Sequence, residues 1–318
     1  MAVLEFKPNA PVVSEHRSAV SIKNVLYATD FSATSESAFP YASAICRRFG
    51  STLHIAHVLS DANIYLMTGG IDYVTVGAIY DDAYLLAQEK VEQLSARLGS
   101  IPYRSYIRHG SVCTNLKEIV AEKAIDLIVV GTHGRTGMGK LLLGSVAENI
   151  LRHATCPVLT VGPNVRGRAR LPEMITQGRE VAPVELELRN ILYATNLTVD
   201  SKVVAPVAVS LAEEFGAAFT LMHVFEHYPD LSAKPGPIEA AVEQLHSLVP
   251  KDAGVAYPPE VVMEFGSAPK CIVKTAVERE ADLIVLGSRP AGLTGHLPWS
   301  TVHEVAAYAP CPVLTVPA

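Results

Sequence analysis

The sequence of 318 residues predicts an α/β fold with two tandem domains, each a five-stranded parallel sheet covered by helices. Short apolar runs, such as Leu-Ile-Val-Val at 127–130, are typical of strands buried on both faces of a parallel sheet. Segments with helical spacing alternate with these runs, as they do when helices connect parallel strands. An internal repeat doubles the pattern, which predicts two copies of one domain.

The repeat is visible at both ends of the copies. Lys-Asn-Val-Leu-Tyr-Ala-Thr-Asp at 23–30 returns as Arg-Asn-Ile-Leu-Tyr-Ala-Thr-Asn at 189–196, and Cys-Pro-Val-Leu-Thr-Val at 156–161 returns unchanged at 311–316. The organisation predicted from these matches is an irregular N-terminal tail at 1–20, a first domain at 21–162, a linker at 163–187 and a second domain at 188–318.

The elements of the first copy follow in a regular order. We expect strands at 23–28, 52–58, 103–108, 126–131 and 157–161. We expect helices at 35–49, 80–98 and 114–123, and a fourth helix after Gly144. Gly50 and Gly99 directly follow the first two helices, where glycine is common because it adopts left-handed dihedrals. An apolar face of the second helix is predicted from Leu85, Leu86, Val91, Leu94 and Leu98.

A glycine-rich segment with the spacing Gly131-x2-Gly134-x9-Gly144-Ser145 joins the fourth strand to the fourth helix. Glycine has no Cβ, so backbone N–H groups in such a segment can approach anionic oxygens closely. Ser145 can cap the helix or bind a phosphate that the helix N-terminus also stabilises. The spacing differs from the Walker loop and from the dinucleotide fingerprint. It predicts a phosphate-binding loop, and a flexible turn with a capping serine is the simpler alternative.

The ligand of an open parallel sheet binds beyond the carboxyl ends of the strands, where the strand order reverses. This rule brings together the ends of the first and fourth strands, and with them Ala28, Thr29 and Asp30 on one side and Val130 and Gly131 on the other. An aspartate at a strand end can also be a turn residue or a helix cap. The sequence alone leaves both roles open for Asp30.

With this glycine spacing at this place, the chain resembles the universal stress protein family. The resemblance implies Rossmann-like domains of the adenine nucleotide alpha hydrolase-like type and an ATP site in the first domain, with Mg2+ accompanying the phosphates. It implies that Asp30 lies against the adenine-ribose end and that the backbone at Val58 meets the base. His133, Arg135 and Lys140 are candidates for positive charge at the phosphate end. The positions that match the ribose and phosphate contacts are Val130, Gly131, Gly134, Gly144, Ser145 and Val146.

The second copy departs from this motif at three positions. Asn196 replaces Asp30, Pro290 replaces Gly134, and Ser300 replaces Gly144. Proline has no N–H to donate and a fixed φ, so the same phosphate cradle should be impaired. We therefore expect the first copy to bind nucleotide and the second to complete the structure.

The composition excludes several other partners. A net charge of -6 and a pI near 6.0 argue against nucleic acid, which needs a basic surface. No apolar run approaches the roughly 20 residues of a membrane helix, and the N-terminus lacks the layout of a signal peptide. We expect a cytoplasmic protein with no membrane partner. No acidic pair, His/Asp constellation or Cys-x-x-Cys spacing predicts a catalytic residue or a metal site.

These features favour a stress-response regulatory protein that binds ATP in its first domain and hydrolyses it slowly at most. The alternatives are a nucleotide hydrolase or nucleotidyl transferase on the related fold, and a nucleotide-independent scaffold or chaperone. Members of the family pair through their final strands, so we expect 157–161 and 312–316 to pair within the chain, and a homodimer of the whole chain is compatible with this. The apolar segment 64–73 can cover the nucleotide or contact a partner chain.

Overall fold

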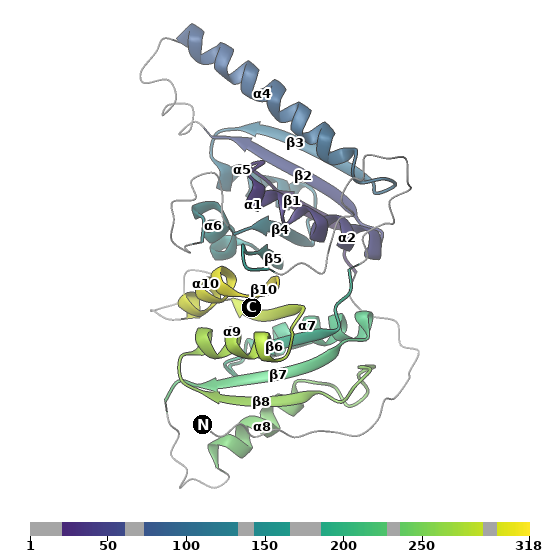
Figure 1. Ribbon diagram of the computed structural model, residues 1–318, viewed down its shortest axis with the longest axis vertical. Helices are drawn as coiled ribbons and strands as arrows, with labels where there is room; N and C mark the ends of the chain where they lie inside the picture. The colour runs from purple at the N-terminus through teal and green to yellow at the C-terminus, as the bar shows by residue number, and fades with distance from the viewer. Residues whose placement is uncertain (1–20, 61–72, 133–142, 166–185, 228–235, 289–297) are drawn as a thin grey trace. The chain divides into compact units, whose positions relative to one another are not determined.

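The computed structural model describes residues 21–60, 73–132, 143–165, 186–227, 236–288 and 298–318 (Figure 1). The chain divides into two compact units. The N-terminal unit contains Ile22–Ile150, and the C-terminal unit contains Leu151–Arg168 and Glu187–Ala318, as far as these ranges are described. The N-terminal tail, most of the linker and the segment 64–72 lie outside the described residues.

The N-terminal unit contains four parallel strands in the order β3-β2-β1-β4. Their bounds are Asn24–Ala28 for β1, Thr52–Leu59 for β2, Tyr103–His109 for β3 and Leu127–Gly131 for β4. Helices pack on this sheet (Figure 1). They are α1 (Ala33–Glu36), α2 (Phe39–Phe49), α4 (Tyr73–Ser95) and α5 (Val112–Glu122), followed by α6 (Ser145–His153), which starts in this unit.

The C-terminal unit has the strand order β5-β10-β9-β6-β7-β8. Five of these strands are parallel, which completes the predicted sheet for the second copy. They are β6 (Asn190–Ala194), β7 (Ala218–Phe225), β8 (Glu260–Phe265), β9 (Leu283–Ser288) and β10 (Val313–Pro317). The helices are α7 (Ser201–Phe215), α8 (Pro237–Ser247), α9 (Ala268–Glu278) and α10 (Pro298–Tyr308). No helix among the described residues is both long enough and apolar enough to cross a bilayer.

The remaining strand of the C-terminal unit, β5 (Val158–Val161), comes from the first sequence repeat. It pairs antiparallel with β10, with Leu159 opposite Leu314, and the Thr160 hydroxyl donates to the Val313 carbonyl oxygen at 3.2 Å. The pairing expected between the two final strands is therefore present. The compact units and the sequence repeats therefore divide the chain at different points.

A carboxylate joins the starts of the central strands in each copy. Asp126 Oδ2 accepts hydrogen bonds from the backbone N–H groups of Lys23 and Asn24, at 2.8 and 2.9 Å. Asp282 Oδ2 accepts from Arg189 and Asn190 in the same way, at 2.8 and 3.0 Å. These bonds satisfy backbone N–H groups just before and at the first residues of β1 and β6, and they fix the positions where these strands begin.

The predicted helix at 35–49 is in fact two helices, α1 and α2. Pro40 occupies the first turn of α2, where helix N–H groups have no intrahelical acceptor and the missing N–H costs nothing. In one continuous helix, residue 40 would have to donate an N–H to the Glu36 carbonyl, which proline cannot do. The chain therefore breaks at 37–38. Gly50 ends α2 with φ 65° and donates to the Cys46 carbonyl, as its position predicts.

The helix predicted at 80–98 is α4, which starts earlier, at Tyr73, and ends at Ser95. Its predicted apolar face is only partly buried. Val91 and Leu94 are buried, as is Leu98 just after the helix, but Leu85 and Leu86 are 58% and 55% exposed. Figure 1 shows α4 diverging from β3 toward the N-terminal end of the helix. The apolar face of α4 therefore extends to Leu85 and Leu86, which the sheet does not cover.

His54 on β2 is buried between two polar partners. Its Nδ1 lies 3.0 Å from the Tyr106 hydroxyl, and its Nε2 lies 3.1 Å from Asn24 Oδ1. An amide oxygen only accepts, so Nε2 carries the proton and Nδ1 accepts from Tyr106. Burial, followed by the positive charges of Arg104 and Lys123, lowers the pKa of His54. The structure thus holds this histidine neutral.

We expect the free energy of unfolding to fall as the pH is lowered from about 7 toward 5. Unfolded histidine takes up a proton near pH 6.5, whereas folded His54 does so only at lower pH, so acid favours the unfolded state between these two values. His54→Gln should reduce this pH dependence in urea unfolding curves. His109→Gln, at an exposed position on β3, is the matched control. An unchanged slope in His54→Gln would contradict this assignment.

Candidate functional site

The ends of β1 and β4 lie side by side, as the topology rule predicts. Ala28 is paired with Val130 in the parallel register, and both residues are buried. The Thr29 N–H continues the pairing by donating to the Ala56 carbonyl of β2 at 3.0 Å. Val58 lies two residues further along β2, beyond its pairing with β1, and is half-buried. The carboxyl edge of the sheet therefore brings together three strand ends.

Thr29 organises this edge through all of its polar groups. Its hydroxyl lies 3.0 Å from the Ser35 hydroxyl and accepts from the N–H of Phe31, also at 3.0 Å. Its carbonyl oxygen lies 2.8 Å from His57 Nδ1, which must carry the proton because a carbonyl only accepts. Phe31 adopts φ 58° and its ring lies 4.5 Å from the His57 ring. The sharp exit of the chain from β1 is thus held from two sides.

Asp30 acts as a turn residue at this exit. Its Oδ1 accepts from the Ser32 N–H at 3.0 Å, and Ser32 in turn caps α1 by accepting from the Ser35 N–H at 3.2 Å. In the second copy, Asn196 Oδ1 makes the same bond to the Thr198 N–H at 3.3 Å. The turn therefore needs an oxygen at this position and does not need a charge.

Gly131, at the end of β4, has a steric reason to be glycine. A Cβ at this position would lie 2.6 Å from the Thr34 carbonyl oxygen and 2.8 Å from Ser35 Cα. Both atoms belong to the backbone of α1, which packs against β4. The sequence predicts Gly131 as part of a ligand-binding loop. The structure gives a second reason for glycine, because α1 could not pack here against a residue with a side chain.

Gly144 and Ser145 lie where the glycine-rich segment enters α6. The Gly144 N–H donates to the Thr132 carbonyl at 2.7 Å, and its own carbonyl accepts the first helical bond, from the Glu148 N–H at 2.9 Å. Gly144 therefore occupies the N-cap position of α6, which the sequence offers to Ser145 as one of its two roles. Ser145 is the exposed first residue of the helix. The N–H groups of Ser145 and Val146 belong to the helix end that has no intrahelical partners.

The described site residues thus fall into two groups. The strand-end group consists of Ala28, Thr29, Asp30, Val58, Val130 and Gly131, and the helix-end group consists of Gly144, Ser145 and Val146. His133, Gly134, Arg135 and Lys140 lie outside the described residues. In the part of the chain that the structure describes, no three metal-ligating side chains come together.

The second copy repeats the support around its first strand end. The Thr195 hydroxyl lies 2.6 Å from that of Ser201 and accepts from the Leu197 N–H at 3.1 Å, and Leu197 has φ 59°. His223 Nδ1 lies 2.9 Å from the Thr195 carbonyl oxygen, and burial lowers the pKa of His223. Sequence reasoning missed this Thr-Ser-His arrangement. Its signal was available, because these residues recur at the same spacing in both repeats.

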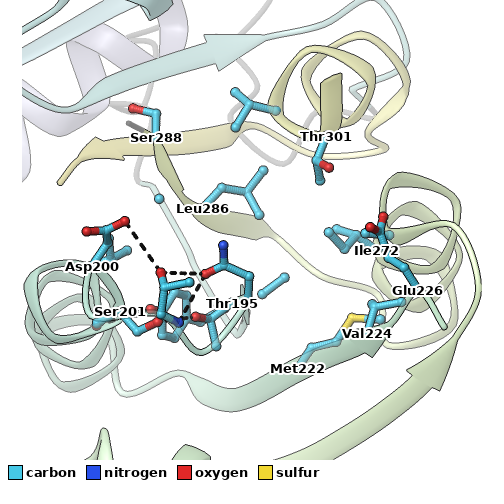
Figure 2. Close-up of a pocket in the computed structure, with 18 residues that line it drawn as sticks. Thr195, Asp200, Ser201, Met222, Val224, Glu226, Ile272, Leu286, Ser288 and Thr301 are labelled. Carbon is cyan, nitrogen blue, oxygen red and sulfur yellow. Dashed lines mark hydrogen bonds between the residues drawn. The ribbon is translucent and has the colours of Figure 1, made fainter. Parts of the chain in front are cut away.

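A cavity of about 280 Å³ lies at the matching place in the second copy (Figure 2). Its walls come from the carboxyl ends of β6, β7 and β9 and from α7, α9 and α10. Figure 2 shows Asp200 and Glu226 on opposite sides, with Leu286 between them. The apolar lining includes Val204, Met222, Val224, Ile272, Leu286 and Val302, and the polar lining includes Thr195, Asn196, Asp200, Ser201, Glu226, Ser288 and Thr301.

The helix beside this cavity starts earlier than its counterpart. α6 starts at Ser145, whereas α10 starts at Pro298, three residues before the matching Thr301. In α10 the N–H group of Val302 therefore lies inside the helix, with the Pro298 carbonyl four residues back. The two copies present different backbone donors to their sites.

Comparisons with known proteins agree on one family. The model of the universal stress protein family matches twice, over residues 21–162 and 187–317. A universal stress protein of Thermus aquaticus is 33% identical over 135 residues, covering 40% of this chain and 98% of that protein, and the relative MJ0577 of Methanocaldococcus jannaschii is 26% identical over 156 residues, covering 45% and 96%. The crystal structure of a universal stress protein from Archaeoglobus fulgidus matches 92% of this chain and 98% of its own chain, with TM-score 0.64 and 19% identity, which supports the fold.

We expect Gly131→Ala to lower the free energy of unfolding by about 1–3 kcal/mol, because its methyl group would collide with the backbone of α1. Gly287→Ala is the matched control, since a Cβ there meets only a methyl group of Val204, at 3.0 Å. Urea unfolding of both variants checks this. Equal losses in the two variants would contradict the steric role of Gly131.

Proposed function

Because the chain is a tandem member of the universal stress protein family, we propose that its first domain binds ATP beyond the carboxyl ends of β1 and β4. The bound nucleotide would regulate the contacts of the protein in a stress response. The observation that carries this proposal is the complete Gly131-x2-Gly134-x9-Gly144-Ser145 motif between the buried strand β4 and the N-terminus of α6. The second domain acts in this proposal as the structural partner.

The phosphate end of the site is assigned to the start of α6. Ser145 and Val146 offer backbone N–H groups that the helix itself does not use, and the helix dipole favours negative charge at the same end. Gly144 is bonded to Thr132, which keeps this end next to the last residues of β4. His133, Gly134 and Arg135 complete the phosphate contacts in the family pattern.

The base and ribose end is assigned to the neighbouring strand ends. Asp30 keeps a carboxylate at this edge, although the turn itself would accept an amide, as Asn196 demonstrates in the second copy. Ala28, Thr29 and Val130 supply backbone and small side chains close to the edge, and Val58 extends it on β2. In this proposal the Asp30 carboxylate accepts a hydrogen bond from a ligand hydroxyl.

Mg2+ enters this proposal with the phosphates. The described residues contain no group of three metal-ligating side chains, so the protein would hold the ion through phosphate oxygens and water, as is common for Mg2+. The proposal contains no catalytic residue. The five cysteines are free thiols, which fits the cytoplasm that we propose as the location.

Calorimetric titration of the nucleotide-stripped protein with Mg-ATP tests the proposal, because it measures affinity and the number of sites together. We expect one site per chain. Absence of binding would overturn the proposal in favour of a nucleotide-independent role. Two sites per chain would overturn the division of roles between the domains.

Asp30→Asn should weaken ATP binding by about tenfold, because the amide keeps the turn oxygen but loses the charged acceptor. The thermal stability of the variant without ligand should stay close to that of the parent protein. The affinity is measured in the same titration. Unchanged affinity would remove Asp30 from the site.

Gly134→Pro, which introduces the residue of the second copy, should abolish ATP binding because proline has no N–H to donate and a fixed φ. Gly134→Ala keeps the N–H and serves as the control, with a smaller expected loss. Both variants are compared with the parent protein by titration and by thermal unfolding. Retained affinity in Gly134→Pro would exclude the glycine segment as the phosphate cradle.

A further inference from the structure

The sheet of the N-terminal unit ends at β3, which pairs with β2 and with no other described strand. Just after β3, the Gly110 N–H donates to the Leu59 carbonyl of β2 at 3.0 Å. The N–H and carbonyl groups of a strand residue point to one side, and this side alternates along the strand. The even-numbered residues therefore face β2, whereas Ser105 and Ile107 direct their backbone groups outward. We call this outward side the β3 edge.

The sheet of the C-terminal unit ends at β8, which pairs with β7 and with no other described strand. The Gly266 N–H donates to the Phe225 carbonyl of β7 at 2.9 Å, which sets the same alternation. Val261 and Met263 therefore direct their backbone groups outward. The side chains of β8 are mostly buried because α8 and α9 pack against it, so the outward backbone is what this strand offers to a partner. We call this side the β8 edge.

The strands at the two edges carry opposite charges at matching positions. β3 contains Arg104 and Arg108, and β8 contains Glu260 and Glu264. The members of each pair lie at the same distances before the glycine that follows their strand. The sign of the charge has therefore been exchanged between the two copies at both positions.

Most of these charges have an ion-pair partner inside their own unit. Arg108 Nη1 lies 3.1 Å from Glu118 Oε2 of α5, and Glu264 Oε1 lies 3.0 Å from Lys274 Nζ of α9. Arg104 is exposed and forms no ion pair with another described residue. A guanidinium has five donors and a carboxylate accepts several hydrogen bonds, so the internal pairs can stay intact when a strand is added at either edge.

One antiparallel register satisfies the outward backbone groups of both edges. It places Ser105 opposite Met263 and Ile107 opposite Val261, each as a hydrogen-bonded pair that exchanges two N–H···O bonds. These four residues are the ones whose backbone groups face outward. The added strand would thus extend the sheet with regular backbone pairing.

The same register brings the opposite charges together. Arg104 falls opposite Glu264 and Arg108 falls opposite Glu260, as non-hydrogen-bonded pairs with Cα atoms about 4.5 Å apart. Opposite charges at such positions stabilise the pairing of two strands. In a parallel arrangement the outward groups meet only when even-numbered residues lie opposite odd-numbered ones, which would separate the arginines from the glutamates.

Pairing of two identical edges brings like charges together. Two β3 edges in full antiparallel overlap would place Arg104 opposite Arg108. The corresponding pair of two β8 edges would place Glu260 opposite Glu264. Like charges directly opposite each other destabilise strand pairing, so the β3 edge selects a β8 edge and not a second β3 edge.

We propose that the β3 edge of one copy of this chain pairs antiparallel with the β8 edge of a second copy, with Ser105 opposite Met263. A pair of copies joined in this way still has one open edge of each kind. Association therefore continues beyond the dimer, into a closed ring or a filament. This inference does not depend on ATP binding by the first domain.

Sedimentation velocity of the full chain over a range of micromolar concentrations tests the proposal. We expect the average mass to rise with concentration beyond that of a dimer, and the association to weaken as salt is added. A mass that stays at that of a monomer or a dimer throughout would overturn the proposal.

Arg104→Glu tests the charge pairing. The new carboxylate would lie opposite Glu264, so association should weaken about tenfold or more, whereas a pair of two β3 edges would become stronger. Lys251→Glu makes the same charge change at an exposed position outside both edges and is the matched control. Unchanged or stronger association of Arg104→Glu would overturn the proposal.

Ser105→Pro tests the backbone pairing. The N–H that proline removes points away from β2, and proline is tolerated at such positions of edge strands. Association should be lost, whereas Ser105→Ala, which keeps the N–H, should associate like the parent protein. Thermal unfolding checks that both variants are folded. A folded Ser105→Pro variant that associates normally would contradict the proposed pairing.

Glu260→Gln tests the partner strand. Glutamine keeps an oxygen for the hydrogen bond from Arg279 Nη1, which is 2.8 Å long in the parent protein, but it removes the charge opposite Arg108. Association should weaken about threefold to tenfold. Glu278→Gln removes an exposed charge from α9 and is the matched control. Equal association of the two variants would exclude β8 as the partner strand.

Discussion

The threonine at the end of the first strand is the constraint on which both sites depend. In each copy its carbonyl accepts from a histidine of the neighbouring strand, and its hydroxyl joins a serine of the following helix, at 3.0 Å for Thr29 and 2.6 Å for Thr195. These bonds hold a residue with positive φ, Phe31 or Leu197, directly after the strand. Positive φ is costly for such residues, so the surrounding bonds must stabilise the turn.

This turn determines what can lie above the sheet. It directs α1 across the end of β4, which leaves room only for a glycine at 131. In the second copy the corresponding helix is the longer α7, and Gly287 faces a side chain of Val204 and no backbone. The two copies thus share the support of the site and differ in the residues that face a ligand. A common scaffold of this kind can carry different ligand-facing residues, since a site is set by side chains that the fold itself does not fix.

The sequence predicted the fold well where the signal was local or repeated. The strand expected at 52–58 is observed as Thr52–Leu59, because its mainly apolar composition reflects burial on both faces. The meeting of Ala28 and Val130 followed from the topology rule. Local patterns could not predict the exposure of Leu85 and Leu86, since that depends on how far the sheet extends beneath α4. The predicted glycine motif includes residues outside those described, so its role stays a prediction.

The cavity of the second copy could not be predicted from the sequence, because the sequence shows only which residues of the glycine motif are missing there. Asn196, Pro290 and Ser300 indicated a lost phosphate cradle, but the cavity is apparent only when the fold brings together the ends of β6, β7 and β9 with α7, α9 and α10. Its lining residues are spread over the second copy and carry no motif.

The connection from α6 to β5 would give the proposed ATP site a covalent route to the strand that pairs with the second repeat. The proposed phosphate donors are at the start of α6, a helix of nine residues, and its other end leads into β5. β5 pairs with β10, the last strand of the second repeat, and a side-chain bond from Thr160 reinforces that pairing. A phosphate that orders the start of α6 acts on an element whose far end is tied to β10. Regulation by a bound nucleotide needs such a shared element, because coupling between sites is carried by contiguous packed structure that both sites can bias.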